Sequence, residues 1–176
     1  MVAGPGLNGT RPFVLTLEMD GESFARLDAL RRQHYPPDRN QVPAHITLFH
    51  QLPGDRSREI KALLRAVAGS QRPFDLRAAA VKAIGTGVAY FLESPQLASL
   101  RNGLAAEWSH WLVDQDRVGF RPHVTIQNKV SPKEAERLQR ELAAGFRAFP
   151  VKGVGLHLWR YAGGPWESVQ LFRFGG

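Results

Sequence analysis

The sequence of 176 residues contains no cysteine, which excludes disulfide bonds, thiolate nucleophiles and zinc sites built from cysteine. It also has no run of about 18 apolar residues, the length that a membrane-spanning helix needs. Residues 1–10 are rich in glycine and lack the basic-then-apolar order of a signal peptide, so we expect a flexible leader there. These absences fit a cytoplasmic protein, and we expect no membrane partner.

The composition is that of an ordinary folded protein, with 43% hydrophobic and 22% charged residues. The length fits a single domain with a core large enough to be stable. A net charge of +7 favours anionic partners such as nucleic acid or nucleotides. A basic protein without such a partner fits the charge equally well, so charge alone does not assign a function.

Two short segments have nearly the same sequence: Pro43–Leu48 reads PAHITL and Pro122–Ile126 reads PHVTI. They lie almost half the chain apart, and each places a His-x-Thr step in an apolar, β-prone run that follows a proline. Alternate side chains of a strand share a face, so the histidine and threonine of each segment point the same way. Two such strands could place two imidazoles on opposite sides of one ligand.

The pattern around these segments repeats in both halves of the chain. A helix precedes each His-x-Thr strand, a second helix follows it, and two further strands come next. The predicted strands are 13–19, 45–52, 74–84, 88–92, 121–130, 151–159 and 167–174, and the predicted helices are 21–34, 57–68, 94–112 and 132–145. No low-complexity linker separates the halves, so we expect one two-lobed domain over residues 11–176.

A facing pair of histidines suits cleavage of a phosphodiester. One imidazole deprotonates the nucleophile and the other protonates the leaving oxygen, and a pKa near 6.5 allows both tasks at neutral pH. Attack and departure are roughly in line at phosphorus, so His45 and His123 would sit on opposite sides of it. Thr47 and Thr125 would donate hydrogen bonds to the non-bridging oxygens. The scheme needs neither a metal nor a cofactor.

Three further residues are candidates for substrate binding by position. Phe49 continues the face of His45 and would stack on a base, although ordinary packing explains it equally well. Gln127 holds the matching place in the second strand, and Lys129 would add a positive charge on the face of His123. Two aromatic residues flank a late turn and fit either the groove or the core: Tyr161 and Trp166.

The other histidines have weaker indications. Strict alternation puts His50 on the face opposite His45, so we expect a structural or surface role for it. A metal site formed by His45, His123 and His50 stays open as an alternative, but no HxH or HExxH spacing supports it. Three histidines are assigned no catalytic role: His34, His110 and His157.

The paired segments, their half-chain spacing and the repeated element order resemble the two-histidine (2H) phosphoesterase superfamily. Within it the chain is most similar to the bacterial 2′-5′ RNA ligase or RNA 2′,3′-cyclic phosphodiesterase group, over residues 11–175. The resemblance implies an α+β fold with two lobes, each an antiparallel sheet with helices outside, and an active-site groove between them. It also implies that His45 and His123 are the acid–base pair, and Thr47 and Thr125 the phosphate-oxygen donors.

One departure from the family pattern concerns the substrate-binding cation. Many members of the ligase-like group carry an arginine shortly after the second motif, where this chain reads Gln127-Asn128-Lys129. Lys129 or Gln127 would substitute for it, or the cation would come from elsewhere in the chain.

The sequence thus predicts a monomeric, metal-independent phosphoesterase that opens 2′,3′-cyclic phosphates on RNA ends or nucleotides to 2′-phosphates. Reverse reaction would give 2′-5′ RNA ligation. We favour His45 as the acid and His123 as the base, with the exchanged assignment open. The alternative is a non-catalytic RNA-end or nucleotide-binding module that uses the same groove.

Overall fold

The computed structural model describes residues 11–175, and the leader expected at 1–10 lies outside the described residues. The strands are β1 (Phe13–Met19), β2 (Ile46–Leu52), β3 (Phe74–Ile84), β4 (Gly87–Glu93), β5 (His123–Gln127), β6 (Phe149–Tyr161) and β7 (Trp166–Arg173). The helices are α1 (Gly21–His34), α2 (Ser57–Ser70), α3 (Pro95–Glu107), α4 (Asp114–Arg117) and α5 (Pro132–Ala144), with 3₁₀ turns η1 (Pro37–Arg39) and η2 (Gly54–Arg56). Helices combine with antiparallel strands, so the predicted α+β class is confirmed. No helix of the described part is both long and apolar enough to cross a bilayer.

Side-chain caps define where the longer helices begin. At α5, the Ser131 hydroxyl accepts from the backbone N–H of Glu134, and the Glu134 carboxylate accepts from the backbone N–H of Ser131. This reciprocal pair satisfies two amide groups that a helix start otherwise leaves unbonded. Ser94 caps α3 and Asp20 caps α1 in the same manner, each through the backbone N–H three residues on.

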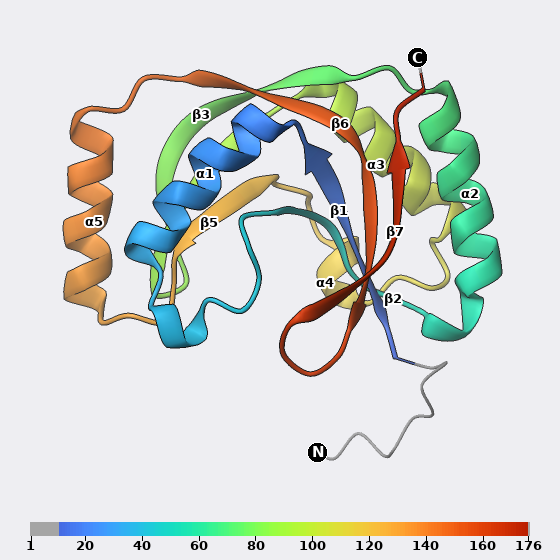
Figure 1. Ribbon diagram of the computed structural model, residues 1–176, viewed down its shortest axis with the longest axis horizontal. Helices are drawn as coiled ribbons and strands as arrows, with labels where there is room; N and C mark the ends of the chain where they lie inside the picture. Colours follow the sequence, from blue (N-terminus) through green and yellow to red (C-terminus); the bar gives the residue numbers. More distant parts are fainter. Residues whose placement is uncertain (1–10, 176) are drawn as a thin grey trace.

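All the strands of the described residues belong to one antiparallel sheet of seven strands, in the order β2-β1-β6-β3-β4-β5, with β7 also paired to β6. The long strand β6 joins the two halves of the chain. Its first part pairs with β3, and its later part lies between β1 and β7. Figure 1 shows β6 arching over the top of the molecule from the end at α5 and then running down beside β1 and β7. The expected division into two lobes with separate sheets is therefore not confirmed.

The core lies where the apolar faces of the strands meet α2 and α3. Fully buried side chains of β1 and β2 pack in the same cluster as Ile60 and Leu64 of α2 and Leu97 and Leu104 of α3. Burial of each such side chain contributes about 1.5–3 kcal/mol, so this cluster fixes the position of β2. The helix α5 packs instead on β3 and β4, and α1 packs on β5 and β6.

The edge strands β2 and β5 approach each other although they lie at opposite ends of the strand order. A buried arginine of α1 ties the region together. Arg31 donates to the carbonyl oxygen of Thr125 in β5 at 2.8 Å and to Asn40 Oδ1, in the loop before β2, at 2.9 Å. Charge-assisted hydrogen bonds of this kind are stronger than neutral ones, so Arg31 holds both His-x-Thr segments relative to α1.

Two predicted elements are shorter in the structure than expected. The helix expected over 94–112 ends at Glu107, and the chain then turns, so that Trp108 is buried against the core. A separate short helix, α4, follows and was not predicted. The strand expected over 121–130 ends at Gln127, because Lys129 adopts a left-handed backbone with φ of 61°. Gly87 lies so close to the carbonyl of Gln127 that a Cβ would stand 1.8 Å from its oxygen, so only glycine fits there.

Candidate active site

The two motif histidines have the same local hydrogen bond. His45 Nδ1 lies 2.7 Å from the carbonyl oxygen of Pro43, and His123 Nδ1 lies 2.8 Å from the carbonyl oxygen of Arg121. A carbonyl oxygen only accepts, so Nδ1 carries the hydrogen in both rings. The neutral form of each ring therefore has its lone pair on Nε2, which is the nitrogen left for proton transfer.

A β-bulge interrupts the first motif strand directly after its threonine. Thr47 and Phe49 pair with adjacent residues of β1, which leaves Leu48 as an extra residue. The alternation of faces shifts by one from this point. Phe49 is consequently fully buried, with its ring 5.2 Å from the ring of Trp108. The expectation that Phe49 continues the groove face of His45 is corrected: it is a core residue.

The second motif strand carries a bulge at the equivalent place. Thr125 and Gln127 pair with adjacent residues of β4, so Ile126 is the extra residue. Gln127 turns inward and is 7% exposed, and its Oε1 is buried without a hydrogen-bond partner among the described residues. Lys129 is exposed in the turn beyond the strand. The expected place of Gln127 on the face of His123 is therefore corrected, because its side chain is buried, whereas the binding role of Lys129 stays a prediction.

Thr47 of the first motif and His123 of the second line one cavity of about 290 Å³. Its positive residues are Arg101 and Arg121, and His50 also faces it. His45 lines a neighbouring cavity of about 190 Å³. The charges of His123 and His50 both contribute to the pKa of His45, so the three imidazoles lie within electrostatic reach of one another.

Burial lowers the pKa of both motif histidines because it disfavours the charged imidazolium. The pKa of His45 falls to about 4, mainly through burial and further through the charge of Arg31. The pKa of His123 is also lowered, mainly by burial, with smaller contributions from the charges of His50 and Arg121. In each ring the hydrogen bond from Nδ1 to a backbone carbonyl raises the pKa, but by less than burial lowers it. Burial therefore favours the neutral form of both rings in the free protein.

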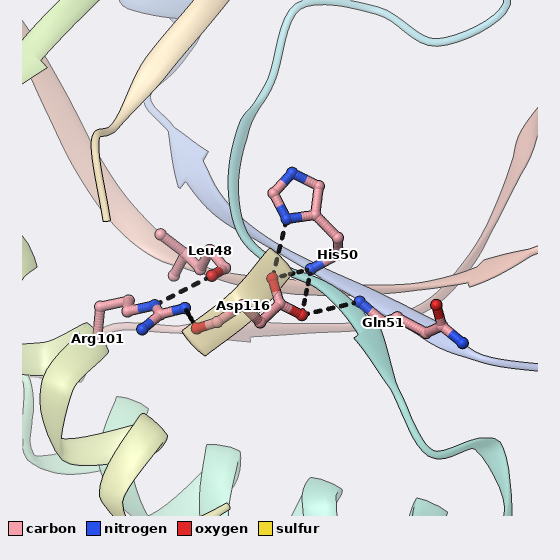
Figure 2. A network of polar contacts seen from close by, with 5 residues as sticks. All are labelled: Leu48, His50, Gln51, Arg101 and Asp116. Atoms are coloured by element: carbon pink, nitrogen blue, oxygen red, sulfur yellow. Dashed lines mark hydrogen bonds and ion pairs between the residues drawn. The ribbon is translucent and has the colours of Figure 1, made fainter. Parts of the chain in front are cut away.

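A third histidine reaches the groove through the bulge of β2. His50 Nδ1 donates to Asp116 Oδ1 at 2.9 Å, and the backbone N–H groups of His50 and Gln51 donate to the same carboxylate. Figure 2 shows the other ring nitrogen of His50 pointing away from Asp116. The side chain of His50 is 43% exposed and that of Asp116 only 1%. The carboxylate thus fixes the ring orientation.

The buried carboxylate of Asp116 is ionised. Burial alone would raise its pKa, but the hydrogen bonds from His50 and Gln51 outweigh burial and hold the pKa below its usual value. Arg101 supports this arrangement from below, since its guanidinium donates to the carbonyl oxygens of Leu48 and Asp116 (Figure 2). Arg101 therefore links α3, the bulge and α4.

Sequence reasoning missed four residues of this site: His50, Asp116, Arg101 and Arg31. Strict alternation placed His50 on the wrong face, because no sequence signal marks the bulge. Asp116 lies in a short helix without an apolar period, so nothing ties it to β2. The arginine substitute expected from elsewhere in the chain has a candidate in Arg121, which lines the cavity of His123. No group of three or more histidine, aspartate or glutamate side chains within residues 11–175 is arranged to hold a metal ion.

Comparisons with known proteins agree with this architecture. The family model of the 2′-5′ RNA ligase superfamily matches residues 19–165. The structure resembles the crystal structure of TT0787 of Thermus thermophilus, with a TM-score of 0.63, 20% identity and coverage of 94% of this chain and 98% of that one. It also resembles E. coli LigT complexed with 3′-AMP, with a TM-score of 0.60, 19% identity and coverage of 95% and 99%. A search of curated protein sequences finds no match.

Proposed function

The chain belongs to the 2′-5′ RNA ligase superfamily, a class of two-histidine phosphoesterases and ligases, and from this premise we propose its reaction. It opens 2′,3′-cyclic phosphates on RNA ends or nucleotides to 2′-phosphates, with His45 and His123 as the catalytic pair. The reaction needs no metal. A ribose 5′-hydroxyl in place of water would give a 2′-5′ linkage through the same two proton transfers.

The observation that carries the proposal is that the two histidine rings make the same hydrogen bond and so have the same tautomer. Each donates Nδ1–H to a carbonyl two residues earlier, and each keeps Nε2 for the substrate. Thr47 lines the cavity of His123, and two arginines line it as well. An anionic phosphate placed there gains hydrogen bonds and positive charge beside His123, and His45 is near enough for the charge of His123 to lower its pKa.

The lowered pKa values support an assignment of the acid and the base. His45, with a pKa of about 4, enters as neutral imidazole and takes a proton from the attacking water. The water oxygen bonds to phosphorus, the bond from phosphorus to the ribose 3′ oxygen breaks, and protonated His123 gives its proton to that oxygen. This reverses the assignment favoured from the sequence. Thr47, Thr125 and Arg121 hold the non-bridging oxygens in this scheme.

Nucleotide substrates are supported by what related folds bind. E. coli LigT has been solved in complex with 3′-AMP, NADP+ and ATP, and it shares the fold of this chain. The net charge of +7 also favours an anionic substrate.

Incubation with the four nucleoside 2′,3′-cyclic phosphates, followed by chromatography and phosphorus NMR, tests the proposal. A nucleoside 2′-monophosphate should form, also in the presence of excess chelator, and His45→Ala or His123→Ala should slow its formation by about 10²–10⁴-fold. His110→Ala, an exposed histidine after α3, is the control. A folded protein that binds a cyclic-ended oligomer without converting any substrate would instead be the non-catalytic binding module.

A further inference from the structure

The cavity next to His45 is lined by aromatic rings. Trp166 lies 4.7 Å from the ring of His45 and 6.1 Å from the ring of Trp159, measured between centroids. Phe24 of α1 lines the same cavity, and its side chain is partly exposed. The cavity, of about 190 Å³, thus offers flat aromatic surfaces one step from a catalytic ring.

This cavity differs in charge from the one that contains His123. Its lining includes one carboxylate, that of Glu18, and neither arginine nor lysine among the described residues. The cavity of His123 is lined by Arg101 and Arg121. Coulomb attraction therefore directs a phosphate to His123, while the cavity at His45 favours an uncharged, flat group that donates hydrogen bonds.

We propose that the cavity at His45 binds the nucleobase of the substrate, with Trp166 as the stacking surface and Glu18 as the acceptor of base N–H groups. This inference rests on the proposed function, because it takes the reacting phosphate to lie between His45 and His123. Stacking on an aromatic side chain accepts any base, so Trp166 supplies affinity and Glu18 supplies the choice of base.

The carboxylate of Glu18 is oriented for this task. Its Oε2 accepts from Nδ1 of His157 at 3.3 Å, and Nε2 of His157 accepts from the Ser168 hydroxyl at 2.8 Å. The ring of His157 is itself stacked on Trp159 at 3.7 Å. A carboxylate has about four lone-pair positions, so one bond from His157 leaves capacity for a base.

A carboxylate acceptor at Glu18 predicts an order of affinity for the four bases. Guanine presents N1–H and the N2 amino group side by side, which matches the two oxygens of a carboxylate. Adenine and cytosine each offer one amino group. Uracil flanks its single N3–H with two carbonyl oxygens, which a carboxylate repels. Guanine should therefore bind best and uracil worst.

Binding of reaction products tests the site without relying on turnover. Dissociation constants are measured by calorimetry for guanosine 2′-monophosphate, uridine 2′-monophosphate and inorganic phosphate. Trp166→Leu should weaken binding of the guanosine nucleotide about tenfold and leave inorganic phosphate unchanged, and Trp166→Phe should recover most of the loss. Trp111→Leu, in the segment after α3, is the matched control. Glu18→Gln should lower the preference for guanosine over uridine about tenfold.

The outcomes separate the base site from the proposed function. If Trp166→Leu leaves the nucleotide affinity unchanged, or weakens phosphate binding as strongly, the base site is wrong even when cyclic phosphates are hydrolysed. Equal affinity of the wild type for the two nucleotides would likewise overturn the role of Glu18. If the expected binding pattern appears while no cyclic phosphate is converted, the base site stands and the proposed reaction fails.

Discussion

The two His-x-Thr strands share the same backbone structure up to a bulge after the threonine and differ beyond it. Both lie at an edge of the sheet, both bond the histidine Nδ1 to a carbonyl two residues earlier, and both have a bulge directly after the threonine. In each strand the bulge turns inward the side chain two residues after the threonine. In β2 that side chain is Phe49, which fills the core; in β5 it is Gln127, which leaves a buried amide oxygen unbonded within the described part.

The surroundings of the two rings differ more than the strands do. His45 packs on Trp166, and the cavity beside it is aromatic with one carboxylate. His123 packs on Phe91 at 5.3 Å, and the cavity beside it is lined by arginines. Beyond the bulge, β2 continues to His50 and its partner Asp116, whereas β5 ends.

This difference teaches how a repeated motif can serve two roles. The shared features set the tautomer and the direction of each ring, so either histidine could transfer a proton. In the proposed reaction the unshared surroundings decide the rest: they attract the phosphate to His123, accept the base near His45, and favour the neutral form of His45. Each prediction below tests one part of that division.

The largest effect is expected from removal of either ring. His45→Ala and His123→Ala should each lower kcat by about 10²–10⁴-fold, the usual contribution of a positioned proton-transfer group. The double variant should be little slower than the slower single variant, because the pair acts as a unit. Steady-state kinetics with thermal melting as a folding check measures this. A folded single variant with a near-normal rate would remove that histidine from the mechanism.

The dependence of kcat/KM on pH should reflect the different pKa values of His45 and His123. The base must be neutral, which places the acidic limb of kcat/KM near the His45 pKa of about 4. The acid must be protonated, and the pKa of His123 is lowered from 6.5, so the alkaline limb lies below that value. The rate should therefore peak between these limits and fall about tenfold for each further pH unit on the alkaline side. Both limbs belong to the coupled pair.

The pH profiles of the two single alanine variants then test which histidine is the acid and which is the base. Residual activity of His45→Ala should lose the acidic limb, and that of His123→Ala should lose the alkaline limb. An optimum above pH 7 would contradict the lowered pKa values as the source of the profile. The reverse pattern of lost limbs would restore His45 as the acid and His123 as the base.

A smaller effect is expected at His50, the feature that only β2 has. Asparagine places an N–H where the ring has Nδ1, so His50→Asn keeps the bond to Asp116 and removes only the nitrogen that faces the groove. We expect KM for a cyclic nucleotide to rise about tenfold, with kcat within about twofold, because the protonated ring donates Nε2–H to a charged phosphate and asparagine cannot replace that donor. His110→Asn is the matched control. Equal KM values for the two variants would leave His50 without a role in binding.

The sequence was sufficient for most of the fold. Helix 21–34 and strands 13–19 and 74–84 have the predicted bounds, because apolar period, caps and turn residues all act locally. The predicted helix 132–145 also begins where expected, with Ser131 as its cap. The repeat of His-x-Thr pointed to both motif strands for the same reason, since alternation holds up to the threonine in each.

The rest of the site depends on contacts between distant residues. The bulges arise where β2 and β5 must fit β1 and β4, and no local pattern encodes them. They moved Phe49 and Gln127 out of the expected groove and moved His50 into it. Asp116 reaches His50 only because Trp108 turns the chain after α3. These residues follow from packing and not from periodicity, so sequence reasoning could not assign them.

The smallest effect compares the two side chains that the bulges turn inward. A buried amide oxygen without a partner costs about 1–3 kcal/mol, so Gln127→Leu should stabilise the protein by about 1 kcal/mol in urea unfolding. Phe49→Leu at the equivalent place should destabilise it by about 1–2 kcal/mol, because it opens space beside Trp108. Neither side chain faces the groove, so kcat/KM should stay within about twofold in Gln127→Leu. A loss of stability there would mean that Gln127 Oε1 is satisfied by a buried water, and a large loss of activity would return Gln127 to the substrate site.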